Sequence, residues 1–196
     1  MNGKKMQQNR FLILGAVFLS VVFLFSGTAD AAEVPSVETP VIITTCGQSP
    51  GAVMVKMSLL HSQITPADTK NDMTAADLTG KGYKTLIVTT GTSGKGMGAA
   101  GTDVNKEIAR CKEIIKAARD EGMVVITAHV EGMARRTDQA DQDSIDEIIP
   151  LGDAILIITS SNPDGYFTKL SQDNNKPLIE AKDALAIGET IKALKK

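Results

Sequence analysis

A cysteine and a histidine that could act as nucleophile and base each follow a short apolar segment. Cys46 follows 41–45 (VIITT), and His129 follows 123–128 (MVVITA). A thiol activated by an imidazole, with a carboxylate orienting the ring, is the basic arrangement for acyl transfer or hydrolysis. One hypothesis is therefore a thiol-dependent hydrolase or acyl transferase with Cys46, His129 and Glu131 as its catalytic residues.

The same loops carry a larger set of groups that suit a small anionic ligand. Cys46 leads into a helix expected to start at Pro50, whose free N–H groups and dipole attract an anion and would lower the pKa of the thiol. Glycines in the loop expected at 90–101 (TGTSGKGMGAAG) let backbone N–H groups approach such an anion, and arginine suits its capture. The predicted ligand-binding residues are Cys46, Gln48, Ser49, Thr90, Gly91, Thr92, Ser93, Lys95, Gly96, His129, Arg135 and Arg136.

The glycine-rich stretch does not match a nucleotide-binding motif in its context. Lys95 precedes Gly96 with no Ser or Thr directly after it, so the stretch is not a P-loop. A G-x-G-x-x-G pattern does occur at 96–101, but it begins well past the apolar segment rather than directly after it. We therefore expect no cofactor. The structural alternatives are a tight turn holding a buried thiol, a mobile surface loop, and a charged loop.

In that charged-loop alternative, the two arginines serve the protein's own structure. Arg135 and Arg136 would pair with Asp138, Asp141 or Asp143. A lone histidine in such a loop is also more often a structural residue than a ligand. A further hypothesis is a protein-interaction module that uses the acidic surface over 138–147.

The elements that must position these loops are five apolar segments of strand length, separated by segments of helical spacing. They are 41–45, 85–89, 123–128, 154–158 and 177–181. Strands that are apolar throughout are buried on both faces, and helices between them imply a parallel sheet. The predicted fold is α/β, a three-layer αβα sandwich with a mainly parallel five-stranded sheet, flavodoxin-like or Rossmann-like. A flavodoxin-like order would make 41–45 and 123–128 neighbours, placing Cys46 beside His129 where such sheets bind ligands.

The first residues have the pattern of a secretory signal peptide. Lys4, Lys5 and Arg10 precede the uncharged run 11–25, and small residues follow it. We predict a signal peptide over 1–31, a linker over 32–40 and a single α/β domain over 41–196. The protein would then be exported to the periplasm or the medium, and it would meet the membrane only through the signal peptide before cleavage.

Composition excludes several classes of partner. The chain has 196 residues, a net charge of -2, 42% hydrophobic residues and no Trp. Mild acidity and few aromatic residues argue against nucleic acid. The absence of C-x-x-C and H-E-x-x-H patterns argues against a preassembled zinc motif. The two cysteines, Cys46 and Cys111, could form a disulfide in an oxidising compartment, but their spacing leaves the pairing open.

Four strings resemble those of one family. They are ITTCGQSPGA, TGTSGKGMGAAGTD, HVEGMARRTDQ and NPDGYFTKL, in this order. From about Val41 to Leu194 the chain resembles a family of exported bacterial proteins known as domain of unknown function 6305. The resemblance implies an α/β fold and export, with no activity or catalytic residue to carry over, and it strengthens the expectation that these loops form a site.

Overall fold

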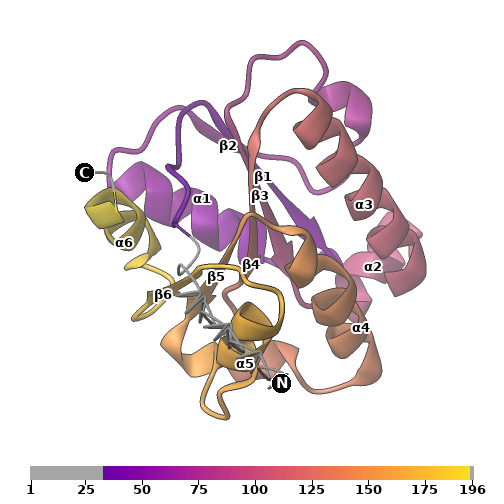
Figure 1. Ribbon diagram of the computed structural model, residues 1–196. Coiled ribbons are helices and arrows are strands. Elements are labelled where there is room, and N and C mark those ends of the chain that lie inside the picture. The colour runs from indigo at the N-terminus through magenta and orange to yellow at the C-terminus, as the bar shows by residue number, and fades with distance from the viewer. Residues whose placement is uncertain (1–32, 195–196) are drawn as a thin grey trace, which may run out of the picture. The chain divides into compact units, whose positions relative to one another are not determined.

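The computed structural model describes residues 33–194, which form one parallel sheet flanked by helices (Figure 1). The strand order is β2-β1-β3-β4-β5-β6, and every neighbouring pair is parallel. The strands are β1 (Val41–Cys46), β2 (Ala67–Thr69), β3 (Thr85–Thr90), β4 (Val124–His129), β5 (Ala154–Ile158) and β6 (Leu178–Ala181). The predicted αβα sandwich is confirmed, with six strands in place of five.

The additional strand is β2, which sequence patterning did not indicate. It has three residues, ADT, and its burial changes from buried to exposed along its length. Such a segment is too short for either strand periodicity or an apolar run. Its presence changes the topology, because β2 takes the edge position beside β1 and leaves β3 as the other neighbour of β1.

Helices cover both faces of the sheet (Figure 1). Two core clusters fill the space between the layers, one under α1 and α6 and one under α3. A third joins α4 and α5 to β5 through Ile145 and Phe167. The α-helices are α1 (Gly51–His61), α2 (Gly94–Ala100), α3 (Val104–Asp120), α4 (Gln139–Ile148), α5 (Tyr166–Asp173) and α6 (Ile187–Leu194). Short 3₁₀ turns are η1 (Ala75–Asp77), η2 (Gly132–Arg135), η3 (Ile149–Leu151) and η4 (Thr159–Ser161).

The glycine-rich stretch after β3 is a helix, not the expected loop. Ser93 caps α2, because its Oγ accepts a hydrogen bond from the N–H of Gly96 over 3.1 Å. Gly101 ends the helix with a φ of 65°, the left-handed conformation that glycine adopts without strain. Serine before and glycine after the stretch therefore outweigh the low helix propensity of its three internal glycines.

Residues 33–40, which belong to the predicted linker, contact the domain. Val37 is buried in the core cluster under α1 and α6. Glu38 N–H donates to Thr85 Oγ1 over 3.0 Å, and that hydroxyl donates to Glu38 O over 2.8 Å. The predicted signal peptide, 1–31, lies outside the described residues. Within the described part of the chain, no helix combines the length and the apolar character needed to span a membrane.

Candidate functional site

The loops that follow β1 and β3 close on each other at the point where the sheet reverses its strand order. Gln48 and Thr92 form an antiparallel bridge, and Ser93 N–H donates to Gly47 O over 2.8 Å. A Cβ on Gly96 would lie 2.3 Å from Gln48 O, so α2 rests directly on the first loop. Sheets of this type bind ligands in this crevice, but here the backbone of the protein occupies it.

The anion position at the start of α1 is held by a carboxylate of the chain itself. Pro50 provides no side-chain cap, and the N–H of Gly51 donates instead to Glu131 Oε1 over 3.0 Å. The other oxygen of Glu131 accepts from Arg135 Nε over 3.1 Å. Arg135 Nη1 also donates to Thr92 O over 2.7 Å. The expected preference of this helix terminus for an anion is thus satisfied within the protein.

The second arginine of the pair is also engaged within the protein. Arg136 forms a two-pronged ion pair with Asp164, with both N–O distances at 3.0 Å. Its guanidinium lies 4.4 Å from the centre of the Tyr166 ring. Both arginines thus serve structural contacts, as the charged-loop alternative proposed. The partners named in that alternative are wrong, because the carboxylates are Glu131 and Asp164.

A buried carboxylate, Asp141, fastens the loop after β3 to the start of α4. Its oxygens accept hydrogen bonds from the N–H and the hydroxyl of Thr92, both at 2.8 Å. They also accept from the N–H and the hydroxyl of Thr137. Burial acts to raise the pKa of Asp141, but these hydrogen bonds together hold it below its ordinary value. The sequence indicated Asp141 only as a candidate partner of Arg135 or Arg136.

His129 is a core residue with no exposed surface. Its Nε2 lies 3.2 Å from Gly132 O, which can only accept, so Nε2 carries the proton. Nδ1 lies 3.1 Å from Thr90 Oγ1, and the ring stacks on Phe167 with centroids 5.2 Å apart. Burial lowers the pKa of His129 to about 4, so the imidazole is neutral at pH 7.

Cys46 also has no exposed surface and lies apart from His129. The expectation of a lowered pKa is wrong, because a hydrogen bond with Cys111 and burial both raise the pKa of the Cys46 thiol. The expected strand adjacency is also wrong, since Cys46 pairs with Thr90 of β3 and His129 lies on the next strand, β4. Two strand spacings separate the cysteine and histidine backbones by about 10 Å.

Most other predicted ligand-binding groups also bond within the protein. Gln48 Nε2 donates to Glu107 Oε2 over 3.0 Å, and Ser49 Oγ lies 3.2 Å from Thr45 Oγ1. Gly91 N–H donates to Ser144 Oγ over 3.0 Å. Lys95 is the exception: it is exposed on α2 and forms no side-chain hydrogen bond or ion pair within residues 33–194. The described residues also hold no group of three or more His, Cys, Asp or Glu that could bind a metal ion.

Sequence reasoning missed the ion pair that supports the first loop. Glu107, on α3, is buried and accepts from the N–H of Gly47 as well as from Gln48. Its partner is Arg110, with Nη2 at 2.6 Å from Oε2, and the same guanidinium donates to Thr45 O. The two charged residues lie one helical turn apart within an amphipathic helix. Nothing in that pattern distinguishes them from solvated charges.

Exposed apolar side chains concentrate on one surface, which we call the α1–α6 face. Of the six large apolar residues exposed within 33–194, four lie there, and the other two are Met133 on η2 and Leu194 at the end of α6. Leu185, in the segment leading into α6, is 74% exposed, and Met57 on α1 is 59% exposed. The four residues of the face are Val53, Met57, Leu60 and Leu185. A groove of about 390 Å³ runs between α1 and the 184–185 segment, lined by Pro50, Val53, Met54, Met57, Ala184 and Leu185.

A second hollow, of about 290 Å³, lies beside β2 and is mainly polar and charged. Two of its carboxylates already have lysine partners. Asp68 pairs with Lys56 at 2.7 Å, and Asp77 pairs with Lys70 at 2.7 Å. These two pairs satisfy both carboxylates of the hollow within the chain.

Comparison with known proteins places the chain in a family. The sequence model described as Domain of unknown function (DUF6305) matches residues 38–194, which is most of the chain. The chain belongs to the DUF6305 family. No curated protein and no solved structure matches it significantly.

In this DUF6305 protein, buried hydrogen bonds hold the apolar groove in shape. Ser58 Oγ, on the inner side of α1, donates to Leu185 O over 2.7 Å and accepts from Gly188 N–H over 2.8 Å. A Cβ on Gly188 would lie 2.3 Å from Ser58 O, so α6 and α1 approach through backbone at this point. Leu185 is therefore presented outward by an anchored segment.

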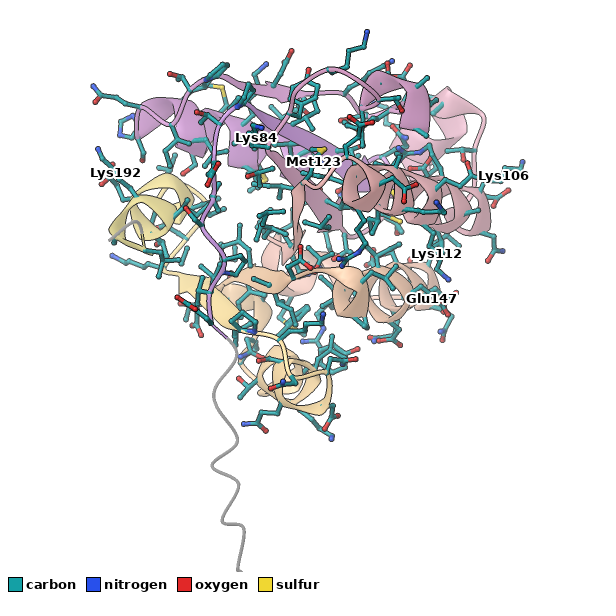
Figure 2. All side chains as sticks on the ribbon, turned by 45° about the horizontal axis from the view of Figure 1, so that its top comes forward. Lys84, Lys106, Lys112, Met123, Glu147 and Lys192 are labelled. Carbon is teal, nitrogen blue, oxygen red and sulfur yellow. The ribbon has the colours of Figure 1, made fainter. Side chains whose placement is uncertain are left out.

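The opposite surface of the DUF6305 domain, formed by α3 and α4, has the character of a solvated face. Lys112 and Glu147 pair at 2.6 Å across these two helices (Figure 2). Arg119 pairs with Asp153 at 3.0 Å nearby. α3 has a single apolar stripe facing the sheet, whereas α1 is apolar on its inner and outer sides. The α3–α4 surface is therefore suited to water, whereas the exposed apolar residues of α1 are suited to contact another apolar surface.

Proposed function

We propose that this protein is an exported, non-catalytic binding module whose α1–α6 face docks on a second copy of the chain. One observation carries the proposal: four of the six exposed large apolar residues within 33–194 gather on this face. A helix that is apolar on all sides is normally covered on all sides. Contiguous apolar surface on an otherwise charged protein marks an interaction site.

The spacing and charge of the face favour a second copy as the occupant. Val53, Met57 and Leu60 follow one another at intervals of four and three residues, the spacing at which two helices interlock side chains. The charged neighbours Lys56 and Lys192 each pair within the chain, with Asp68 and Glu189. Two identical faces can therefore meet about a two-fold axis without like charges opposing them.

Export is supported by the sequence of residues 1–31, with its basic start, uncharged run and small residues. The small-anion hypothesis stays a prediction, and exposed Lys95 on α2 is its remaining free cation. The acidic-surface hypothesis for 138–147 also stays a prediction. The thiol-enzyme hypothesis gains no support from two buried side chains on non-adjacent strands.

The test is sedimentation equilibrium over a wide concentration range, with the chain as its host processes it. We expect a dimer, and we expect Leu185→Asp and Met57→Asp to shift it to a monomer by placing a carboxylate in the apolar contact. Met133→Asp is the matched control, because Met133 is 41% exposed outside the face and its variant should stay dimeric. Circular dichroism verifies that all three variants are folded.

Two results would overturn the proposal. The first is a wild-type protein that is monomeric at every concentration. The second is a dimer that the α1–α6 variants weaken no more than Met133→Asp does. Native mass spectrometry of the same samples identifies other occupants of the groove, and a bound apolar small molecule or a different protein chain would replace the second copy.

A further inference from the structure

The two cysteines of the chain lie against each other inside the domain. Cys46 is the last residue of β1, and Cys111 lies on the buried stripe of α3. Cys111 Sγ lies 3.7 Å from the carbonyl oxygen of Thr45, the residue before Cys46. Both are free and both have no exposed surface. They belong to one core cluster between the sheet and α3.

We propose that Cys46 and Cys111 are joined by a disulfide bond in the exported protein. The oxidant is a disulfide of the exporting compartment, either a thiol–disulfide oxidoreductase or a small disulfide. In the exchange, one thiolate attacks the donor disulfide and forms a mixed disulfide. The second thiolate then displaces the donor sulfur. The Cys46–Cys111 S–S bond forms, the donor S–S bond breaks, and the donor leaves as two thiols that carry the two protons.

The inference rests on the export part of the proposed function and is independent of the docking surface. Disulfides persist in oxidising compartments and are rare where thiols are kept reduced. A sequence separation of 65 residues (111 − 46) leaves the pairing undecided. The sheet–helix packing favours the pairing, because it puts both cysteines in one core cluster and brings Cys111 Sγ to 3.7 Å from the backbone of the residue before Cys46.

Such a bond would tie the end of β1 to α3 beside the loop that begins at Gly47. That loop is already attached to α3 through Glu107, which accepts from the N–H of Gly47 over 3.2 Å. The bond would secure one side of the switch-point closure described above. It would also leave Cys46 without a free thiol, which removes the nucleophile that the thiol-enzyme hypothesis requires.

Burial predicts when the bond forms. Contact with Cys111 and burial raise the pKa of the Cys46 thiol, so the folded protein presents little thiolate to an oxidant. We therefore expect the disulfide to form during folding, before α3 packs against β1 and buries the two thiols. Protein that folds in a reducing cytosol should retain two free thiols and oxidise slowly when oxidised glutathione is added to the native state.

The first experiment reads the redox state directly by mass. The exported protein is quenched in acid, unfolded, treated with iodoacetamide and weighed with and without prior reduction. We expect no adduct without reduction and two adducts after it, with the unreduced, untreated chain about 2 Da lighter than the reduced chain. The same chain made in a reducing cytosol is the matched control and should take two adducts without reduction. Two adducts on the unreduced exported protein would overturn the proposal.

A refolding experiment tests whether the two cysteines can pair, independently of whether the protein is exported. The reduced chain is refolded from denaturant in a mixture of reduced and oxidised glutathione, and we expect complete formation of the Cys46–Cys111 bond. Free thiols or glutathione adducts after refolding would overturn the pairing itself. If refolding gives the bond but the protein recovered from its host is reduced, the failed part is export, and the proposal for the cellular protein falls with it.

Stability measurements identify the consequence of the bond. Reducing the wild type should lower its thermal midpoint by about 10 °C, because the closed loop is long. The double variant Cys46→Ala, Cys111→Ala keeps small apolar side chains in the core and should match the reduced wild type. An oxidised wild type with the same midpoint as its reduced form would contradict a stabilising bond.

Discussion

Glu131 caps the first turn of α1 by accepting a hydrogen bond from Gly51 N–H over 3.0 Å. Gly51 begins the helix that follows β1, and Glu131 lies in the loop that follows β4, so the contact joins the carboxyl ends of the sheet across the intervening β3. A Cβ on Gly51 would lie 2.9 Å from the same oxygen, which makes glycine the residue that permits this approach. The N-terminus of α1 binds the carboxylate of Glu131 and so links two loops of the protein. A position that would suit an anionic ligand therefore has a structural role.

Glu131→Gln should destabilise the protein by about 1–2 kcal/mol. The amide can still accept from Gly51, but it removes the negative charge at the helix terminus and the ion pair with Arg135. Urea unfolding monitored by circular dichroism measures the change. Glu189→Gln is the control, because Glu189 is exposed and its pair with Lys192 is long at 3.9 Å, so we expect almost no effect. Equal effects of the two substitutions would contradict a capping role for Glu131.

The sheet was predictable from sequence because its long strands are apolar on both faces, and β2 was not, because three residues carry no pattern. Spacing also predicted α1, but it did not reveal which side faces the sheet. Val53, Met57 and Leu60 form the most regular stripe in α1, yet they are exposed, while Val55 and Leu59 are buried. Apolar residues on two sides of a helix both favour burial, and only the tertiary structure shows which side packs against the sheet.

Several residues of the predicted site lie together in the structure, and most of their polar groups have partners within the protein. Thr92, Arg135 and His129 do gather at the carboxyl edge, as strand-end positions must in a parallel sheet. Sequence could not show that their partners come from the same chain, because Asp141 and Glu131 are one carboxylate each among many in polar segments. Charge and hydrogen-bonding capacity are visible in a sequence, but whether they are satisfied internally depends on tertiary contacts.

Stability should fall as the pH is lowered from about 6.5 to about 4, and His129 should account for about 3 kcal/mol of the loss. The folded-state pKa of His129 is about 4, below the ordinary value of 6.5, because burial opposes the charged ring. Between these values the unfolded chain binds a proton that the folded protein excludes, so acid favours unfolding. Above about 6.5 both states are neutral and the contribution is complete.

Urea unfolding at several pH values, with variants of each histidine, tests this pH dependence. His129→Gln should flatten the slope between pH 4 and 6.5, whereas His61→Gln, at an exposed residue, should keep the wild-type slope. The His129 ring signals in NMR spectra should also stay constant from pH 8 to pH 5. Titration of His129 within that range would show that the ring is accessible to protons in the folded state.

Asp141→Asn should destabilise the protein by about 2–4 kcal/mol. The carboxylate is 2% exposed and accepts four hydrogen bonds from Thr92 and Thr137. An amide in its place turns one acceptor into a donor that faces N–H and O–H donors. Asp143→Asn, two residues further along α4 on a more accessible side chain, should change stability by less than about 0.5 kcal/mol. Hydrogen exchange at Thr92 N–H provides a local readout, and we expect it to accelerate only in the Asp141 variant.

Two glycines of α2 should respond to alanine in opposite directions. A Cβ on Gly98 meets nothing within 4 Å, so Gly98→Ala should stabilise the protein by about 0.5–1 kcal/mol through helix propensity. A Cβ on Gly96 would lie 2.3 Å from the backbone oxygen of Gln48, so Gly96→Ala must displace α2 from the first loop. We expect a loss of about 1–3 kcal/mol in urea unfolding, together with faster hydrogen exchange at Ser93 N–H, which bonds Gly47 O. Both residues lie in the same short helix, so the gain in helix propensity from glycine to alanine should be similar at the two positions. The difference between the two variants then reports the contact with Gln48. A gain in stability from both substitutions would show that α2 does not rest on Gln48, and that the crevice between the β1 and β3 loops is open.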